Sequence, residues 1–129
     1  MGAVAPDADV LIGFLDDRDA QHRRAIGALR PFLEPGHRLV IGASVYSEVL
    51  ARPLAQGRGE VVDEFVRASG ARIAPVDHAV ARRAAALRAK HRSLRLPDAL
   101  VLAGAIEAGA DLLTFDEGLL RLAGRISSP

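Results

Sequence analysis

The chain has 129 residues and no cysteine, and its 17 basic and 16 acidic side chains give a formal net charge of +1. This length predicts one domain, spanning residues 1–129, and the lack of cysteine excludes disulfide frameworks and thiolate metal sites. The balanced charge favours no class of partner, and because the sequence shows neither a membrane-length apolar run nor a signal peptide, we expect a cytoplasmic protein that does not enter a membrane.

The first third of the chain predicts one strand and two helices. Residues 3–5 form a short apolar strand, and Asp7 stands between this strand and an apolar run at residues 10–15 that predicts the first helix. A polar break follows, in which Asp19 is the expected N-cap of a helix over residues 20–33. A carboxylate therefore lies directly at the first junction between a strand and a helix.

The middle of the chain repeats this order. Residues 39–41 predict a second strand, and Ser44 is the expected cap of a helix over residues 45–52, whose second turn carries Glu48. Apolar side chains at helical spacing predict another helix over residues 60–68. A second carboxylate thus follows a strand within one or two helical turns.

Further elements complete the pattern: a strand at 72–76, a helix at 78–92 capped by Asp77, a nearly all-apolar helix from Pro97 to Gly109, a strand at 112–114, a short helix at 117–122 and a candidate terminal strand at 125–126. The apolar helix is expected to be buried on nearly every side. Strands that alternate with helices indicate an α/β fold. We expect an α/β/α sandwich with a central, mainly parallel sheet of four or five strands.

Two acids flank the apolar helix and the strand after it. Asp98 lies in the first turn of that helix, and Asp116 lies just past the strand. A helix of about eleven residues climbs roughly 16 Å and the strand returns by a similar distance, so the two acids are predicted neighbours. Asp7 and Glu48 are expected at the same edge, because the carboxyl ends of parallel strands lie together and form the usual place for a site.

Four carboxylates at one edge require a cation, because like charges otherwise repel one another or take up protons. Their oxygen ligands favour Mg²⁺ or Mn²⁺ over zinc, and the four histidines show no paired ligand spacing. Such a cluster suits hydrolysis of a phosphate ester. Each acid also has a structural alternative: Asp7 and Asp98 suit helix N-termini, Asp116 suits a turn, and Thr114 beside it is either a support for the site or an ordinary strand residue.

These residues resemble the PIN-domain family of metal-dependent ribonucleases, and in particular the VapC toxins of bacterial toxin–antitoxin pairs. The resemblance spans nearly the whole chain and rests on four segments in order: Asp7-Ala8-Asp9-Val10-Leu11-Ile12, Ser44-Val45-Tyr46-Ser47-Glu48-Val49-Leu50, Leu96-Pro97-Asp98-Ala99 and Leu113-Thr114-Phe115-Asp116. It implies a PIN-like fold. It also implies that Asp7, Glu48, Asp98 and Asp116 bind Mg²⁺ or Mn²⁺, with Thr114 in support.

Two positions depart from the family pattern. Asp9 stands where the family more often has Asn, Ser or Thr, and its extra negative charge is expected to alter metal binding. Pro6 replaces an apolar strand residue. The resemblance further implies an endoribonuclease acting on transfer or ribosomal RNA, a homodimer, and a VapB-like antitoxin whose tail reaches the active site.

A basic segment leads into Asp98 and could hold RNA phosphates without reading sequence. Its members are Arg82, Arg83, Arg88, Lys90, Arg92 and Arg95. The alternative for each is a solvated helix face. Two other functions stay open: a haloacid-dehalogenase-like phosphatase with Asp7 as nucleophile, which lacks a suitably placed lysine because Lys90 is the sole one, and a PIN-like module that binds RNA or protein without cleavage.

Overall fold

The structure, a computed structural model, describes residues 2–127 and centres on a parallel sheet. Its four strands are β1 (Ala3–Pro6), β2 (Arg38–Gly42), β3 (Arg72–Ala74) and β4 (Ala110–Leu113). Their order is β3-β2-β1-β4, and every pairing is parallel. The predicted parallel α/β sheet is confirmed.

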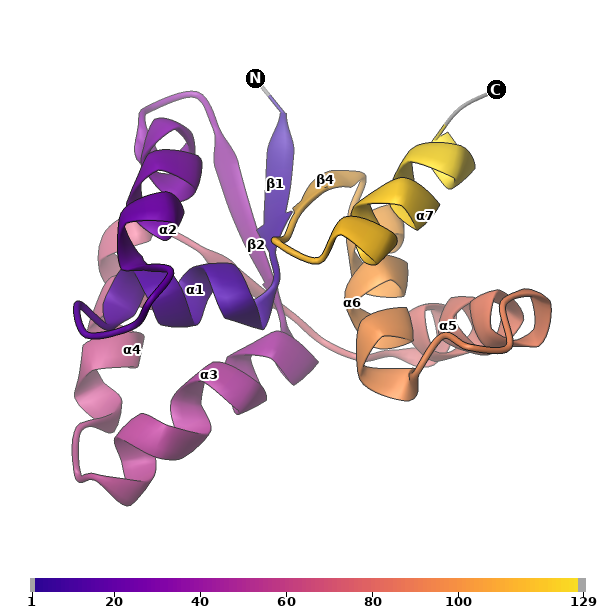
Figure 1. Ribbon diagram of the computed structural model, residues 1–129. Coiled ribbons are helices and arrows are strands. Elements are labelled where there is room, and N and C mark those ends of the chain that lie inside the picture. Colours follow the sequence, from indigo (N-terminus) through magenta and orange to yellow (C-terminus); the bar gives the residue numbers. More distant parts are fainter. Residues whose placement is uncertain (1, 128–129) are drawn as a thin grey trace.

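Helices cover both faces of this sheet (Figure 1). One face carries α1 (Ala8–Leu15), α2 (His22–Leu29), α3 (Ala43–Ala55) and α4 (Gly59–Ser69). The other carries α5 (His78–Lys90), α6 (Leu96–Glu107) and α7 (Glu117–Ser127). The arrangement is the expected α/β/α sandwich. Within residues 2–127, no helix has both the length and the apolar character needed to span a membrane.

The core is divided between the two faces. The larger cluster packs the sheet against α1 to α4 and includes Val4, Val10, Leu11, Leu29, Leu39, Ile41 and Val45. On the other face, α5 packs against α6 through Val80, Ala84, Ala99 and Ala103. Leu119 and Leu122 of α7 pack against Leu102 of α6. Removing these apolar groups from water stabilises the sheet and both helical layers.

The strand order creates a switch point at the carboxyl edge of the sheet. From β1 the chain moves outward to β2 and β3, and it returns to add β4 on the other side of β1. Asp7 follows β1 and residues 114–116 follow β4, so both segments lie where the chain reverses direction across the sheet. Open α/β sheets form their ligand sites at such points.

Several predicted boundaries are wrong for local reasons. Asp19 does not cap α2: its carboxylate accepts the N–H of Gln21 at 2.9 Å within a turn, and the helix starts two residues later than expected. Pro31 lies in a separate 3-10 helix over Arg30–Leu33 instead of extending α2.

The third helix and the C-terminal end also differ from expectation. Ser44 is not a cap, because α3 begins at Ala43 after Gly42 and continues through Pro53 to Ala55. Residues 125–126 belong to α7 and not to a terminal strand, so the sheet has four strands among the described residues. The third strand ends at Ala74, ahead of Pro75.

The close crossing of α1 and α2 depends on Gly13. A Cβ at this position would lie 3.0 Å from Ala25 Cβ and 3.2 Å from the carbonyl oxygen of Gln21, and the carbonyl of Gly13 accepts a 2.7 Å hydrogen bond from His22 Nδ1. We expect Gly13→Ala to lower the free energy of unfolding by about 1–3 kcal/mol, because the backbone must move apart. Urea denaturation measures this loss.

Gly27→Ala is the matched control on the facing helix. A Cβ there meets no atom within 4 Å, so the substitution should stabilise the protein by roughly 0.5–1 kcal/mol through helix propensity. If the two variants changed stability by equal amounts, the crossing would not depend on Gly13.

Candidate metal centre

Asp7 joins the end of β1 to the start of α1. It is the N-cap of α1, and its Oδ1 accepts the N–H of Ala8 at 2.7 Å. Its own N–H donates to the carbonyl of Leu113 at 2.8 Å, which ties it to the end of β4. A carboxylate in this position is favoured by the partial positive charge of the helix N-terminus. Helix capping therefore holds Asp7 at the switch point of the sheet.

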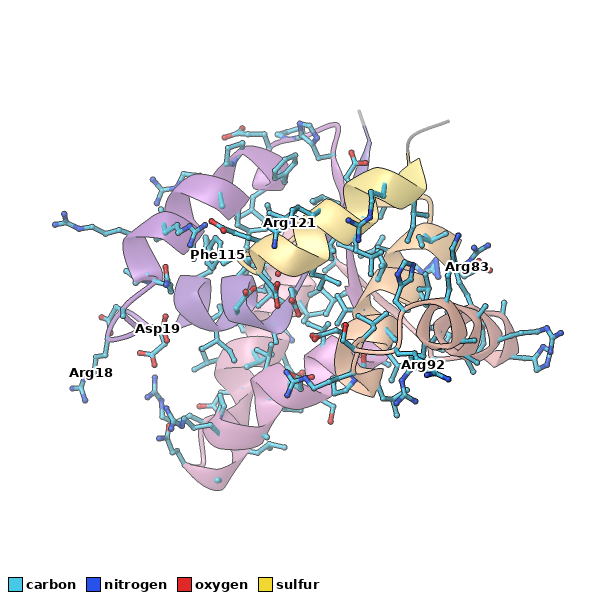
Figure 2. The ribbon with its side chains drawn as sticks, turned by 45° about the vertical axis from the view of Figure 1, so that its right-hand side comes forward. Arg18, Asp19, Arg83, Arg92, Phe115 and Arg121 are labelled. Carbon is cyan, nitrogen blue, oxygen red and sulfur yellow. The ribbon has the colours of Figure 1, made fainter. Side chains whose placement is uncertain are left out.

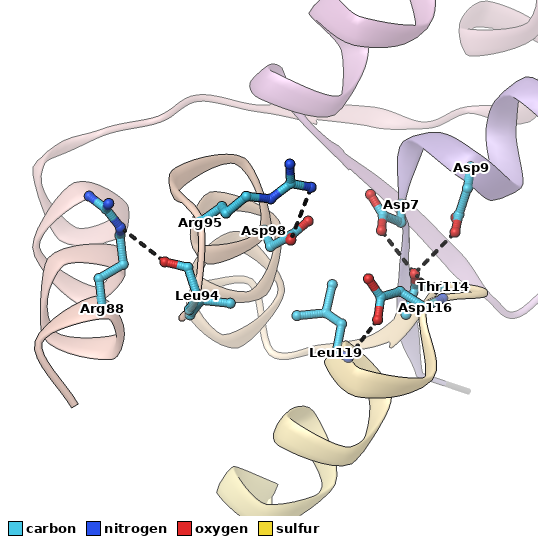
Figure 3. Close-up of polar contacts among 9 residues, drawn as sticks. All are labelled: Asp7, Asp9, Arg88, Leu94, Arg95, Asp98, Thr114, Asp116 and Leu119. Atoms are coloured by element: carbon cyan, nitrogen blue, oxygen red, sulfur yellow. Dashed lines mark hydrogen bonds and ion pairs between the residues drawn. The ribbon is translucent and has the colours of Figure 1, made fainter. Parts of the chain in front are cut away.

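Thr114 connects Asp7 with the turn that follows β4. Its side chain is buried, with 4% of the residue exposed, and its hydroxyl donates to Asp7 Oδ2 at 2.8 Å. The same oxygen accepts the N–H of Asp116 at 3.1 Å, and Asp116 Oδ1 accepts the N–H of Leu119 at 3.0 Å. Figure 3 shows the resulting chain of polar contacts. One hydroxyl thus links two of the predicted ligands.

Asp9 follows Ala8 in α1 and accepts a hydrogen bond from the turn that follows β4. Its Oδ2 accepts the N–H of Phe115 at 3.1 Å and lies 3.4 Å from the hydroxyl of Thr114. Among the described residues, its Oδ1 is buried and has no hydrogen-bond partner. Burial raises the pKa of Asp9, the negative charge of Asp7 adds to this rise, and the N–H of Phe115 opposes it. The carboxylate therefore carries a charge that its protein donors compensate only in part.

Asp98 and Glu48 complete the set from two further helices. Partial burial raises the pKa of Asp98; the guanidinium of Arg95 opposes the rise, and the charges of Asp116 and Asp7 add to it. Partial burial also raises the pKa of Glu48, followed by the charges of Asp7 and Asp98. These mutual effects mean that the four predicted ligands share one electrostatic environment, and Figure 3 shows Asp7, Asp98 and Asp116 extending from three elements toward a common space.

Glu48 lies on α3 beside two buried valines. Its neighbours Val45 and Val49 are buried, but the glutamate itself is exposed, so burial does not force it to find a partner. It stands one turn and a half into α3, at the rim of the acidic cluster. Its long side chain is therefore free to rotate toward or away from the three aspartates.

The donor set suits a hard divalent cation, because all side chains at the cluster offer oxygen. The unpaired Oδ1 of Asp9 and the raised pKa values of Glu48 and Asp98 each indicate uncompensated negative charge. Across residues 2–127, however, no three His, Cys, Asp or Glu side chains already stand close enough to coordinate one ion. Coordination would thus require side-chain rotation, for which the exposed Glu48 and the surface-facing oxygens of Asp98 are the best placed.

The predicted basic segment divides into paired and unpaired side chains. Arg83 forms an ion pair with Glu107, and Arg88 Nε donates to the carbonyl of Leu94 at 3.3 Å. Arg95 reaches Asp98, with 3.9 Å between Nη2 and Oδ2. The remaining members, Arg82, Lys90 and Arg92, are exposed. The structure therefore places only Arg95 of this segment in contact with a predicted ligand.

Sequence reasoning missed Arg24. Its guanidinium lies 4.2 Å from the centroid of the Phe115 ring, within reach of a cation–π interaction. This contact joins α2 to the turn that bonds Asp9. No local sequence pattern indicates it, because the two residues are far apart in the chain.

Comparison with known proteins identifies the family. The PIN domain model matches residues 4–125, nearly the whole chain. The protein belongs to the PIN-domain family. Membership confirms the resemblance and removes the basis of the phosphatase alternative.

Solved structures share this PIN fold. A toxin–antitoxin complex from Klebsiella pneumoniae is 25% identical with a TM-score of 0.69, covering 84% of this chain and 82% of that one. FitAcB from Neisseria gonorrhoeae is 20% identical with a TM-score of 0.72 over 94% and 93% of the two chains. VapC20 from Mycobacterium tuberculosis, a toxin that cleaves the sarcin–ricin loop, is 17% identical with a TM-score of 0.69 over 92% and 94%. No curated protein matches the sequence.

The hydroxyl of Thr114 offers a direct test of how this PIN site is held. We expect Thr114→Val to lower the free energy of unfolding by about 1 kcal/mol, because the N–H of Asp116 and a carboxylate oxygen of Asp7 each lose a partly buried hydrogen bond. Thermal and urea denaturation measure the change.

Thr114→Ser keeps the hydroxyl and removes only a methyl group, so it should retain most of the stability of the wild type. Equal destabilisation by valine and serine would assign the effect to packing and not to the polar contacts.

Proposed function

We propose that this PIN-domain protein is an endoribonuclease that depends on Mg²⁺ or Mn²⁺ and serves as the toxin of a toxin–antitoxin pair of the VapBC type. The main support for nuclease activity is that four carboxylates come from separate segments to the switch point of the sheet: Asp7, Glu48, Asp98 and Asp116. Family membership supports the same chemistry.

These four carboxylates would hold the cation. When bound, the cation would polarise a phosphoryl oxygen and lower the pKa of a water molecule, so that water replaces one ester oxygen at phosphorus. Thr114 keeps Asp7 and Asp116 in a fixed relation through its hydroxyl. Asp7 and Asp116 are each held by a backbone N–H at the start of a helix, Ala8 in α1 and Leu119 in α7.

The proposed substrate is single-stranded or looped RNA, including transfer or ribosomal RNA. The structural neighbour VapC20 is a toxin that cleaves the sarcin–ricin loop, and cleavage of a loop agrees with this proposal. Arginines of the basic segment would contact phosphates around the site: Arg82, Arg92 and Arg95 with their exposed side chains, and Arg83 and Arg88 once they release Glu107 and the carbonyl of Leu94. Such contacts supply affinity without reading the bases.

The proposed partner is a VapB-like antitoxin, and a groove beside the acidic cluster suits it. The groove has a volume of about 720 Å³, with Ile12 and Val61 on its apolar wall and Arg52 and Arg58 among its charged residues. Glu48 lines one end, so a peptide in the groove would reach the proposed site. A homodimer, carried over from the family resemblance, completes the assembly, and light scattering after size exclusion measures it.

The nuclease is tested by RNA cleavage with and without added Mg²⁺ or Mn²⁺. We expect the wild type to cleave only with the cation, and both Asp7→Asn and Asp98→Asn to lose at least about 100-fold in rate, because each removes one anionic ligand. Gel analysis of labelled total RNA measures the products, and circular dichroism checks folding.

Asp111→Asn is the matched control, since this acid is exposed on β4, the strand that leads to Thr114. It should cleave like the wild type. Equal cleavage by the wild type and both site variants would refute the nuclease, and binding of RNA without cleavage would instead favour a non-catalytic PIN-like module.

The toxin and its partner are tested by growth of the source host. Expression of the wild type should arrest growth, and co-expression of the cognate antitoxin should restore it. Val61→Asp should still arrest growth but resist rescue, because a charge on the apolar wall of the groove opposes peptide binding.

Val76→Asp is the control for an exposed valine away from the groove and should be rescued normally. Normal growth at confirmed soluble expression of the wild type would contradict the proposed toxin function. Rescue of Val61→Asp by the antitoxin would contradict only the proposed binding of the antitoxin in the groove.

A further inference from the structure

Two arginines flank the acidic cluster from separate elements. Arg95 precedes the first turn of α6, with Nη2 3.9 Å from Asp98 Oδ2. Arg121 lies on α7, the helix that Asp116 caps (Figure 2). Arg95 thus lies beside Asp98, and Arg121 lies on the helix that begins after Asp116.

The position of Arg121 follows from Gly118. A Cβ at Gly118 would lie 3.3 Å from Asp116 Oδ1 and 3.9 Å from Arg121 Nη2, so both groups approach the same space above this glycine. A Cβ at this position would be tight against the carboxylate but in ordinary contact with the guanidinium. The guanidinium of Arg121 therefore lies near the capping oxygen of Asp116, because both are within 4 Å of the same point.

Neither arginine is committed to an internal partner. The contact of Arg95 with Asp98 is at the outer limit of an ion pair, and 81% of the Arg95 side chain is exposed, so it stabilises the fold little. Arg121 is also exposed. Arg83 and Arg88, by contrast, are held by Glu107 and by the carbonyl of Leu94. Arg95, close to Asp98, and Arg121, close to Asp116, therefore have donors available to an anion from solvent.

We propose that Arg95 and Arg121 hold two phosphates of an RNA strand, one on each side of the phosphate that reaches the acidic cluster. This assignment rests on the proposed ribonuclease function. An arginine presents parallel N–H donors that match two phosphate oxygens, and two such contacts offset the repulsion between the carboxylates and the RNA backbone. Because they bind phosphate, the two arginines position the strand for any base sequence.

The test is the salt dependence of RNA binding, measured by fluorescence anisotropy with a short, labelled, single-stranded RNA of mixed sequence. All proteins carry Asp7→Asn so that the RNA stays intact. We expect Arg95→Ala and Arg121→Ala each to weaken binding and to reduce the slope of log affinity against log salt by about 0.7, the value for one phosphate contact on a single strand. Lysine at either position should restore the slope.

Arg38→Ala and Arg125→Ala are the controls and should leave the slope unchanged. Arg38 starts β2, at the opposite edge of the sheet from the acids, and Arg125 lies one turn beyond Arg121 on α7. Unchanged slopes for Arg95→Ala and Arg121→Ala would overturn the proposal. The proposal would also be overturned if Arg95→Ala changed the affinity for Mn²⁺ but not the salt dependence of RNA binding. The arginine would then act only on Asp98.

Cleavage by the protein with Asp7 intact, measured in the same buffer, separates this proposal from the function on which it rests. Metal-dependent cleavage together with unchanged slopes overturns the phosphate contacts alone. No cleavage together with reduced slopes supports the phosphate contacts and overturns the nuclease.

Discussion

Mutual repulsion among carboxylates is the constraint around which this structure is arranged. Asp7, Asp9, Asp98 and Asp116 approach one another at the carboxyl edge of the sheet, where burial and then the charges of neighbouring acids raise the pKa of Asp9 and Asp98. Backbone N–H groups at the starts of α1 and α7 and the hydroxyl of Thr114 offset part of this cost. The acids are thus held in place by donors that the fold has to supply for helix capping in any case.

The order of the strands explains why a small number of hydrogen-bond donors is enough to hold the acids in place. Asp7 and Asp116 follow neighbouring strands, and the backbone pairing of Asp7 with Leu113 sets their relation before any side chain is considered. Thr114 then needs only one hydroxyl to reach both acids. The crossing of α1 on α2 at Gly13 holds the far end of the helix that Asp7 caps, so packing far from the acids also fixes their geometry.

The sequence was most informative where local chemistry and periodicity coincide. Asp7, Asp98 and Asp116 stand at predicted junctions of strands and helices, and the structure brings these junctions together. Predictions were wrong where a local pattern fits two structures: Asp19 forms a turn instead of a cap, and residues 125–126 continue α7, which packs on Leu102 through Leu119 and Leu122. The cation–π contact of Arg24 with Phe115 could not be predicted, because it depends on the tertiary arrangement of distant segments.

The raised pKa values determine how the acidic cluster affects stability as the pH changes. An acid whose pKa is higher in the folded than in the unfolded chain favours folding most below its ordinary pKa, and this contribution is lost as the pH rises through the folded value. For Asp9, Glu48 and Asp98 the loss begins near pH 4, so at neutral pH the ionised cluster opposes folding. A bound cation would reverse this balance, because it stabilises the ionised form of the same groups. Two of the proposed metal ligands, Glu48 and Asp98, and their neighbour Asp9 are therefore groups whose ionisation the rest of the fold must offset.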